Sequence, residues 1–127
     1  MSYIATARPE VQKSLGKHYL LDLWGCSPEL LNDRPFLERV VREAVAATGA
    51  TLISLHGHEF SPYGITIVAL LKESHLSVHT WPEKGYVAVD VFTCGETVPE
   101  RALPVFRRYL KPRRVEAHCL PRGRMES

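Results

Sequence analysis

Four strand-like segments follow one another between residues 50 and 92 with very little chain between them. They are ATLISLHGHEF (50–60), GITIVALL (64–71), HLSVHTW (75–81) and YVAVDVF (86–92). Each is rich in β-branched or aromatic residues and is bounded by Gly, Pro or charged residues. Connections this short favour antiparallel neighbours, because parallel strands need a crossover of a dozen residues or more. The middle of the chain is therefore predicted to form a mainly antiparallel sheet.

Helical spacing appears on either side of this block. Residues 34–49 repeat apolar side chains at three- and four-residue steps, and Gly49 stands where a C-terminal cap belongs. A second helix is indicated by the capping-box pair Thr97 and Glu100 and by an apolar stripe that ends before Pro112. Pro104 inside this stripe indicates a start later than the capping box, because an interior proline removes a backbone hydrogen bond.

Two further strand-like runs, HYLLDLW (18–24) and RVEAHCL (114–120), complete the pattern. The expected fold is α+β: a two-layer sandwich with a mainly antiparallel sheet and two helices on one face. At 127 residues the chain is predicted to be one domain, residues 1–127. The first dozen residues and the final PRGRMES are expected to be loose termini.

Charge and cysteine content narrow the class of function. The chain has 16 basic and 14 acidic residues, a formal charge of +2, which gives no reason to expect a nucleic-acid partner. No apolar run is long enough for a membrane span, so no membrane association is predicted. The three cysteines are an odd number without a CxxC pair, which favours reduced thiols in the cytoplasm.

Reactive side chains gather in ESHLSVHTWPE (73–83) and FTCGE (92–96), and three chemistries compete for them. One is a metal site built from histidines two apart on strands, with Cys94 or Glu59 completing the ligand set. The histidine pairs are His56 with His58 and His75 with His79. Their spacing matches no specific zinc signature, and no metal is predicted. A second chemistry is nucleophilic attack by Cys94 with a histidine base, beside the alternative of an inert buried thiol.

The third chemistry uses the Glu73–Ser74 peptide bond itself. A serine hydroxyl can attack the preceding carbonyl and replace the amide by an ester, after which a base removes the serine α-proton and elimination cleaves the chain. The reaction needs a turn at the serine, a base and a donor for the oxyanion. His79 lies five residues on, and in an uninterrupted strand it would face away from Ser74. A bend or chain end near Ser74 is therefore required.

Taken together, these motifs resemble the signature of the short, prokaryotic type of S-adenosylmethionine decarboxylase proenzyme. The resemblance extends through GATLISLHGHEFSPYG (49–64) to SLGKHYLLDLWGC (14–26) and covers roughly residues 14 to 118. It implies autocatalytic cleavage into a β chain, residues 1–73, ending at Glu73, and an α chain, residues 74–127. Ser74 would become a covalent pyruvoyl group, the cofactor that forms a Schiff base with the substrate.

The resemblance also assigns individual roles. His79 matches the proton acceptor of processing, and Cys94 matches the residue that protonates the product carbon after decarboxylation. Thr66 stands where relatives often carry a serine that assists processing, and a threonine keeps the hydroxyl. His75 is interpreted as shaping the cleavage turn, and Trp81 with Pro82 as fixing the next one.

Three residues are predicted from the resemblance to bind substrate. Phe60 would stack on adenine, Glu83 would accept the ribose hydroxyls, and Leu76 would line the same pocket. From the residues alone, Phe60 could equally be a core side chain and Glu83 a solvated turn acid. Cys26 and Cys119 are interpreted as structural.

The resemblance implies decarboxylation of S-adenosylmethionine for spermidine synthesis, by a homodimer of processed αβ units with both partners contributing to each active site. Two alternatives stay open at this point. One is a pyruvoyl-dependent arginine or ornithine decarboxylase on the same fold. The other is an unprocessed, non-catalytic binding paralogue.

Overall fold

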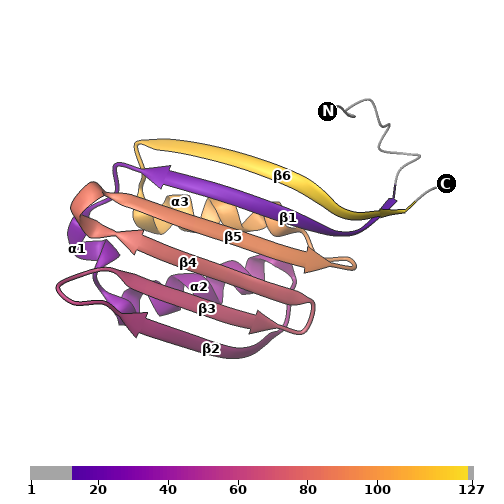
Figure 1. Ribbon diagram of the computed structural model, residues 1–127, viewed down its shortest axis with the longest axis horizontal. Coiled ribbons are helices and arrows are strands. Elements are labelled where there is room, and N and C mark those ends of the chain that lie inside the picture. The colour runs from indigo at the N-terminus through magenta and orange to yellow at the C-terminus, as the bar shows by residue number, and fades with distance from the viewer. Residues whose placement is uncertain (1–12, 126–127) are drawn as a thin grey trace.

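Six strands form one antiparallel sheet in the computed structural model, which describes residues 13–125 (Figure 1). Their order across the sheet is β2-β3-β4-β5-β1-β6, and each neighbouring pair is antiparallel. This confirms the predicted antiparallel block. The strands are β1 (Lys13–Trp24), β2 (Leu52–Glu59), β3 (Ile65–Leu71), β4 (Ser74–Trp81), β5 (Tyr86–Cys94) and β6 (Arg114–Met125).

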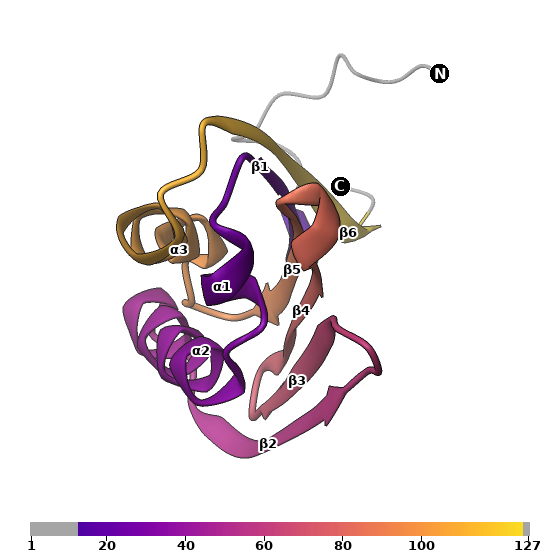
Figure 2. The ribbon, with the colours of Figure 1, turned by 90° about the vertical axis from the view of Figure 1, so that its left-hand side faces the viewer.

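Helices cover one face of this sheet. The two longer ones are α2 (Arg34–Thr48) and α3 (Ala102–Leu110), and a four-residue helix, α1 (Pro28–Leu31), precedes them. Two short 3-10 turns, η1 (Pro82–Lys84) and η2 (Pro99–Arg101), connect other elements. Figure 2 shows α2 and α3 side by side on the same side of the sheet. The two-layer α+β sandwich expected from the sequence is confirmed.

The hydrophobic core lies between the sheet and the helices. In β5, Val87, Val89 and Val91 are almost fully buried, because alternate residues of a strand point to the same face. Val41 of α2 and Phe106 of α3 are fully buried in the same core cluster. The opposite side of the sheet, here called the open face, is not covered by any helix of residues 13–125 (Figure 2).

The ends of the two longer helices follow local sequence signals. Asp33 caps α2 by accepting a hydrogen bond from the Phe36 N–H at 3.1 Å, and Gly49 ends it with a φ of +85°. The predicted capping box of the second helix is wrong. The Thr97 hydroxyl instead donates to the Cys94 carbonyl, and α3 begins at Ala102, so Pro104 falls in its first turn. A proline is tolerated there because the N–H groups of the first turn have no partner within the helix.

The first and last strands in the sequence, β1 and β6, are longer than their sequence patterns indicated. The predicted strands 18–24 and 114–120 extend to β1 and β6, which pair along most of their length. Residues 121–125 were expected to be loose but continue β6, with Pro121 opposite Lys17. The expected looseness of residues 1–12 falls outside the described residues. Between residues 13 and 125, no helix has the length and apolar character needed to cross a membrane.

Candidate active site

The Glu73–Ser74 bond lies at a tight β-hairpin. β3 and β4 are joined by Lys72 and Glu73 alone, and Leu71 pairs directly with Ser74. Glu73 is tied to the segment before β2, because its Oε1 accepts a hydrogen bond from the Thr51 N–H at 3.0 Å. The chain therefore turns immediately before Ser74, and the Glu73–Ser74 bond lies at the end of the hairpin. The φ of Ser74 is 158°, close to extended backbone, so this angle gives no sign of stored strain.

Cys94 points at the carbonyl of this same bond. Its thiol donates to the Glu73 carbonyl oxygen with an Sγ–O distance of 3.2 Å. That carbonyl carbon is the atom that the Ser74 hydroxyl would attack, so the thiol is placed to stabilise the resulting oxyanion. Cys94 ends β5, is exposed, and is followed by Gly95 in a left-handed conformation with a φ of +74°. We call Glu73, Ser74 and Cys94 the Ser74 half-site.

A second group forms at the other end of β4. The Oγ1 of Thr66 and the Nδ1 of His79 are 3.0 Å apart, and the two residues are direct cross-strand partners in β3 and β4. Both line a cleft of about 390 Å³, within the range of small-molecule sites. Phe60 and Glu83 line the same cleft. We call Phe60, Thr66, His79 and Glu83 the His79 half-site.

Of the three predicted substrate-binding residues, Phe60 and Glu83 line the cleft and Leu76 does not. Phe60 is 52% exposed, with its ring 4.6 Å from that of His58, so it is not the core side chain that its apolar character allowed. Glu83 lies in η1, which Pro82 begins, and this agrees with the expected turn after Trp81. Leu76 does not agree with its predicted role. It is fully buried in the core between the sheet and the helices, and it is not among the residues that line the cleft.

The two half-sites are separated within one chain. Residues 74–81 form an uninterrupted strand, so the bend before Ser74 does not bring His79 back toward it. At about 3.3 Å per residue, five residues of strand place His79 about 16 Å from Ser74. A general base has to come within hydrogen-bond reach of the proton that it removes. His79 therefore cannot serve Ser74 of the same chain in this conformation.

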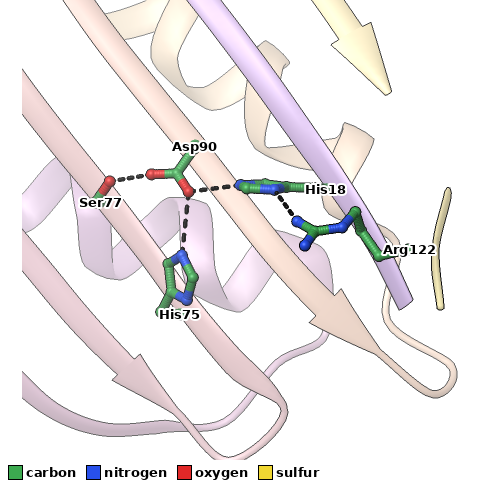
Figure 3. A network of polar contacts seen from close by, with 5 residues as sticks. All are labelled: His18, His75, Ser77, Asp90 and Arg122. Carbon is green, nitrogen blue, oxygen red and sulfur yellow. Dashed lines mark hydrogen bonds and ion pairs between the residues drawn. The ribbon is translucent and has the colours of Figure 1, made fainter. Parts of the chain in front are cut away.

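The histidine pairs proposed for a metal site do not come together. His56 interacts with Ser54 at 3.0 Å, and His58 contacts Phe60. Within residues 13–125, the one group of His, Cys, Asp or Glu side chains with ligand atoms close enough for an ion contains neither His56 nor His58. Of the second pair it contains His75 but not His79. It consists of His18, His75 and Asp90, shown in Figure 3.

The cysteines outside the site differ from each other. Cys26 is buried, and burial raises the pKa of its thiol to about 11, as suits an inert structural residue. Cys119 was also interpreted as structural, yet it is exposed on β6, where its thiol approaches Glu100 at 3.5 Å.

Asp90 is the residue that sequence reasoning missed. It is the only charged residue in β5, and it accepts hydrogen bonds from Ser77, His18 and His75 (Figure 3). Burial raises the pKa of its carboxyl group, but these three hydrogen bonds outweigh burial and hold the pKa below its ordinary value. The available signal was the carboxylate itself, because a charge in an apolar strand needs partners.

Comparison with known proteins agrees with this arrangement. The family model described as S-adenosylmethionine decarboxylase matches residues 17–123. The S-adenosylmethionine decarboxylase proenzyme of Methanococcus vannielii is 54% identical over 112 residues, which cover 87% of this chain and 92% of that protein. The proenzyme of Thermomicrobium roseum is 51% identical over 113 residues, covering 87% of this chain and 96% of that protein.

A solved structure extends the likeness to the fold. The crystal structure of the adenosylmethionine decarboxylase from Aquifex aeolicus superposes with a TM-score of 0.82 at 38% sequence identity. The match covers 90% of this chain and 95% of that one. Family match, relatives and fold all span the hairpin, the Cys94 turn and the His79 cleft. The chain belongs to the S-adenosylmethionine decarboxylase family.

Proposed function

We propose that this protein decarboxylates S-adenosylmethionine, using a pyruvoyl group that it makes by cleaving its own chain between Glu73 and Ser74. The product would feed spermidine synthesis. The observation that carries the proposal is the Cys94 thiol bound to the Glu73 carbonyl, 3.2 Å away, at a hairpin turn next to a serine. The products would be a β chain, residues 1–73, and an α chain, residues 74–127.

Cleavage uses the chain's own groups. The Ser74 hydroxyl oxygen bonds to the Glu73 carbonyl carbon, and the carbon–nitrogen bond breaks to leave an ester. A base then takes the Ser74 α-proton, and elimination expels the Glu73 carboxylate. The dehydroalanine left at position 74 tautomerises to an imine, and water hydrolyses it with loss of ammonia. Cys94 stabilises the oxyanion of the first step.

His79 is the base in the elimination step. The Thr66 Oγ1 lies 3.0 Å from His79 Nδ1. In the tautomer in which Nδ1–H donates to this hydroxyl oxygen, the other ring nitrogen, Nε2, keeps a lone pair for the α-proton. Thr66 supplies a hydroxyl at this position, the group that the family resemblance assigns to assisting self-cleavage.

A second copy of the chain completes each site, because His79 lies about 16 Å from Ser74 along its own strand. A two-fold axis that exchanges the ends of the strands would set each Ser74 half-site beside the partner's His79 half-site. The open face supports this pairing. Val68, Leu70 and Trp81 leave 39%, 48% and 39% of their surfaces exposed there, although all three are large apolar residues.

Substrate binding follows from the His79 half-site. The exposed ring of Phe60 offers a stacking surface for adenine, and Glu83 offers a carboxylate for the ribose hydroxyls. The pyruvoyl group would supply an electron sink for the pair of electrons released with carbon dioxide. Cys94, beside position 74, would return a proton to the substrate α-carbon. Three free cysteines suit a reducing compartment such as the cytoplasm.

The test is intact-mass spectrometry of the purified protein, before and after cyanoborohydride trapping with S-adenosylmethionine, arginine or ornithine. We expect two chains divided at Glu73–Ser74, with the α chain lighter by one ammonia than a chain that begins with serine. S-adenosylmethionine should add covalently to the α chain. If only arginine or ornithine is trapped, that amino acid is the substrate in place of S-adenosylmethionine. A single chain that traps nothing would identify a non-catalytic binding protein.

A further inference from the structure

A polar network on the open face begins one residue after the proposed cleavage point. Asp90 Oδ2 lies 3.1 Å from His75 Nε2 and 2.7 Å from His18 Nε2, and Asp90 Oδ1 accepts from the Ser77 hydroxyl (Figure 3). Arg122 of β6 lies 3.0 Å from His18 Nδ1. The network therefore links four neighbouring strands, β4, β5, β1 and β6.

The contacts of His18 are those of a hydrogen-bond network and do not suit a metal site. An arginine side chain can only donate, so Arg122 makes His18 Nδ1 an acceptor. The proton of a neutral His18 is then on Nε2, directed at Asp90, where a metal ion would have to bind. A guanidinium group beside this histidine also opposes a second positive charge.

The network holds the start of β4 at two points. Ser77 is the direct cross-strand partner of Asp90, and His75 reaches the same carboxylate from one step closer to the hairpin. The residue before the bond is anchored separately, because the Glu73 side chain and the Lys72 N–H bind the Thr51 backbone at 3.0 Å and 2.9 Å. The Glu73–Ser74 bond thus lies between two sets of hydrogen bonds, one to the Thr51 backbone and one to the Asp90 carboxylate.

We propose that Asp90 is a positioning residue for self-cleavage, acting through His75 to hold Ser74 where its hydroxyl can reach the Glu73 carbonyl. The inference rests on the proposed function. Asp90 touches neither the scissile bond nor Cys94 and belongs to neither half-site. Its effect falls on the first step, formation of the ester, because that step depends on the alignment of Ser74 with the preceding carbonyl.

The experiment follows cleavage of freshly synthesised full-length chain over time, by intact mass. Asp90→Asn should slow cleavage about 10-fold or more, the effect of losing one hydrogen bond to a charged group. Asp22→Asn is the matched control. Asp22 lies in β1, on the same face of the sheet as Asp90, and its carboxylate also accepts a side-chain hydrogen bond, from Tyr86. Its cross-strand partner in β5 is Ala88, which is far from the hairpin. It should cleave at the wild-type rate.

Two further readouts separate positioning from general loss of structure. Hydroxylamine cleaves esters, so it should split a His79→Ala chain that stalls after the ester forms. It should leave Asp90→Asn largely uncut, because that variant stalls before the ester. In a double-mutant cycle, His75→Ala with Asp90→Asn should be no slower than His75→Ala alone. Urea unfolding and sedimentation would show that the variants keep their fold and assembly.

The outcomes are distinct. The inference is supported if Asp90→Asn is cleaved slowly, accumulates no hydroxylamine-sensitive ester, and does not slow cleavage further when it is combined with His75→Ala. If wild type cleaves and Asp90→Asn cleaves at the same rate, or accumulates ester, the inference is overturned while the proposed function stands. If wild type does not cleave at all, both are overturned.

Discussion

Two inactive variants, Ser74→Ala and His79→Ala, should restore self-cleavage when they are produced together. Neither homodimer can be cleaved, because one lacks the nucleophile and the other lacks the base. In a mixed dimer, the intact Ser74 of one chain meets the intact His79 of the other. The physical reason is the separation of about 16 Å between these residues within one strand. Only a shared site allows the defects to complement.

The size of the effect follows from random pairing. Half of the dimers would be mixed, and each mixed dimer would contain one complete site and one with both defects. About a quarter of all chains should therefore be cleaved, and decarboxylation should approach about a quarter of the wild-type rate. Every cleaved chain should carry the His79→Ala substitution, because only that chain retains Ser74.

Intact mass reads both the fraction cleaved and the identity of the cleaved chain. The two variants would carry different affinity tags, and sequential purification would confirm that mixed dimers form. Mixed dimers in which neither chain is cleaved would refute the shared site. Cleavage of the His79→Ala chain by itself would remove His79 from the role of base.

Four other perturbations have defined outcomes. Phe60→Ala should raise the KM for S-adenosylmethionine about 10-fold and leave self-cleavage unchanged, because loss of base stacking costs about 1–3 kcal/mol. Steady-state kinetics would measure the KM, and an unchanged value would contradict the stacking role. Cys94→Ala should slow cleavage about 100-fold through loss of the oxyanion donor, and any processed fraction should decarboxylate poorly; wild-type rates in both assays would remove the role. Phe106→Ala should lower the free energy of unfolding by about 3–5 kcal/mol in urea, since its side chain is fully buried. Folding lowers the pKa of Asp90, so its carboxylate stabilises the fold above the unfolded pKa of about 4, and this effect is lost as pH falls through the folded pKa. The difference in unfolding free energy between wild type and Asp90→Asn should shrink over that pH range. A constant difference would contradict the role given to the three hydrogen bonds of Asp90.

The fold could be predicted from sequence where the signal was local. Period-two patterns in the middle strands, short connections and the apolar stripe of α2 all reflect contacts within a few residues, and each was confirmed. The start of α3 was harder. The Thr97 hydroxyl has two possible partners, and only packing shows that it binds the Cys94 carbonyl rather than capping a helix. The lengths of β1 and β6 depended likewise on pairing between distant segments.

For the candidate site, the sequence by itself determined which groups are present: a Glu73–Ser74 bond preceded by Lys72, the histidines of ESHLSVHTWPE and the thiol of FTCGE. Motif spacing is a property of the chain, so it identified the chemistry. Distances between residues on different strands are not a property of the chain alone, so three features required the tertiary structure. These are the Cys94 contact with the Glu73 carbonyl, the separation of His79 from Ser74, and the network around Asp90. Each depends on which strands lie side by side and in which register, and register is fixed by burying one face of the whole sheet against the helices.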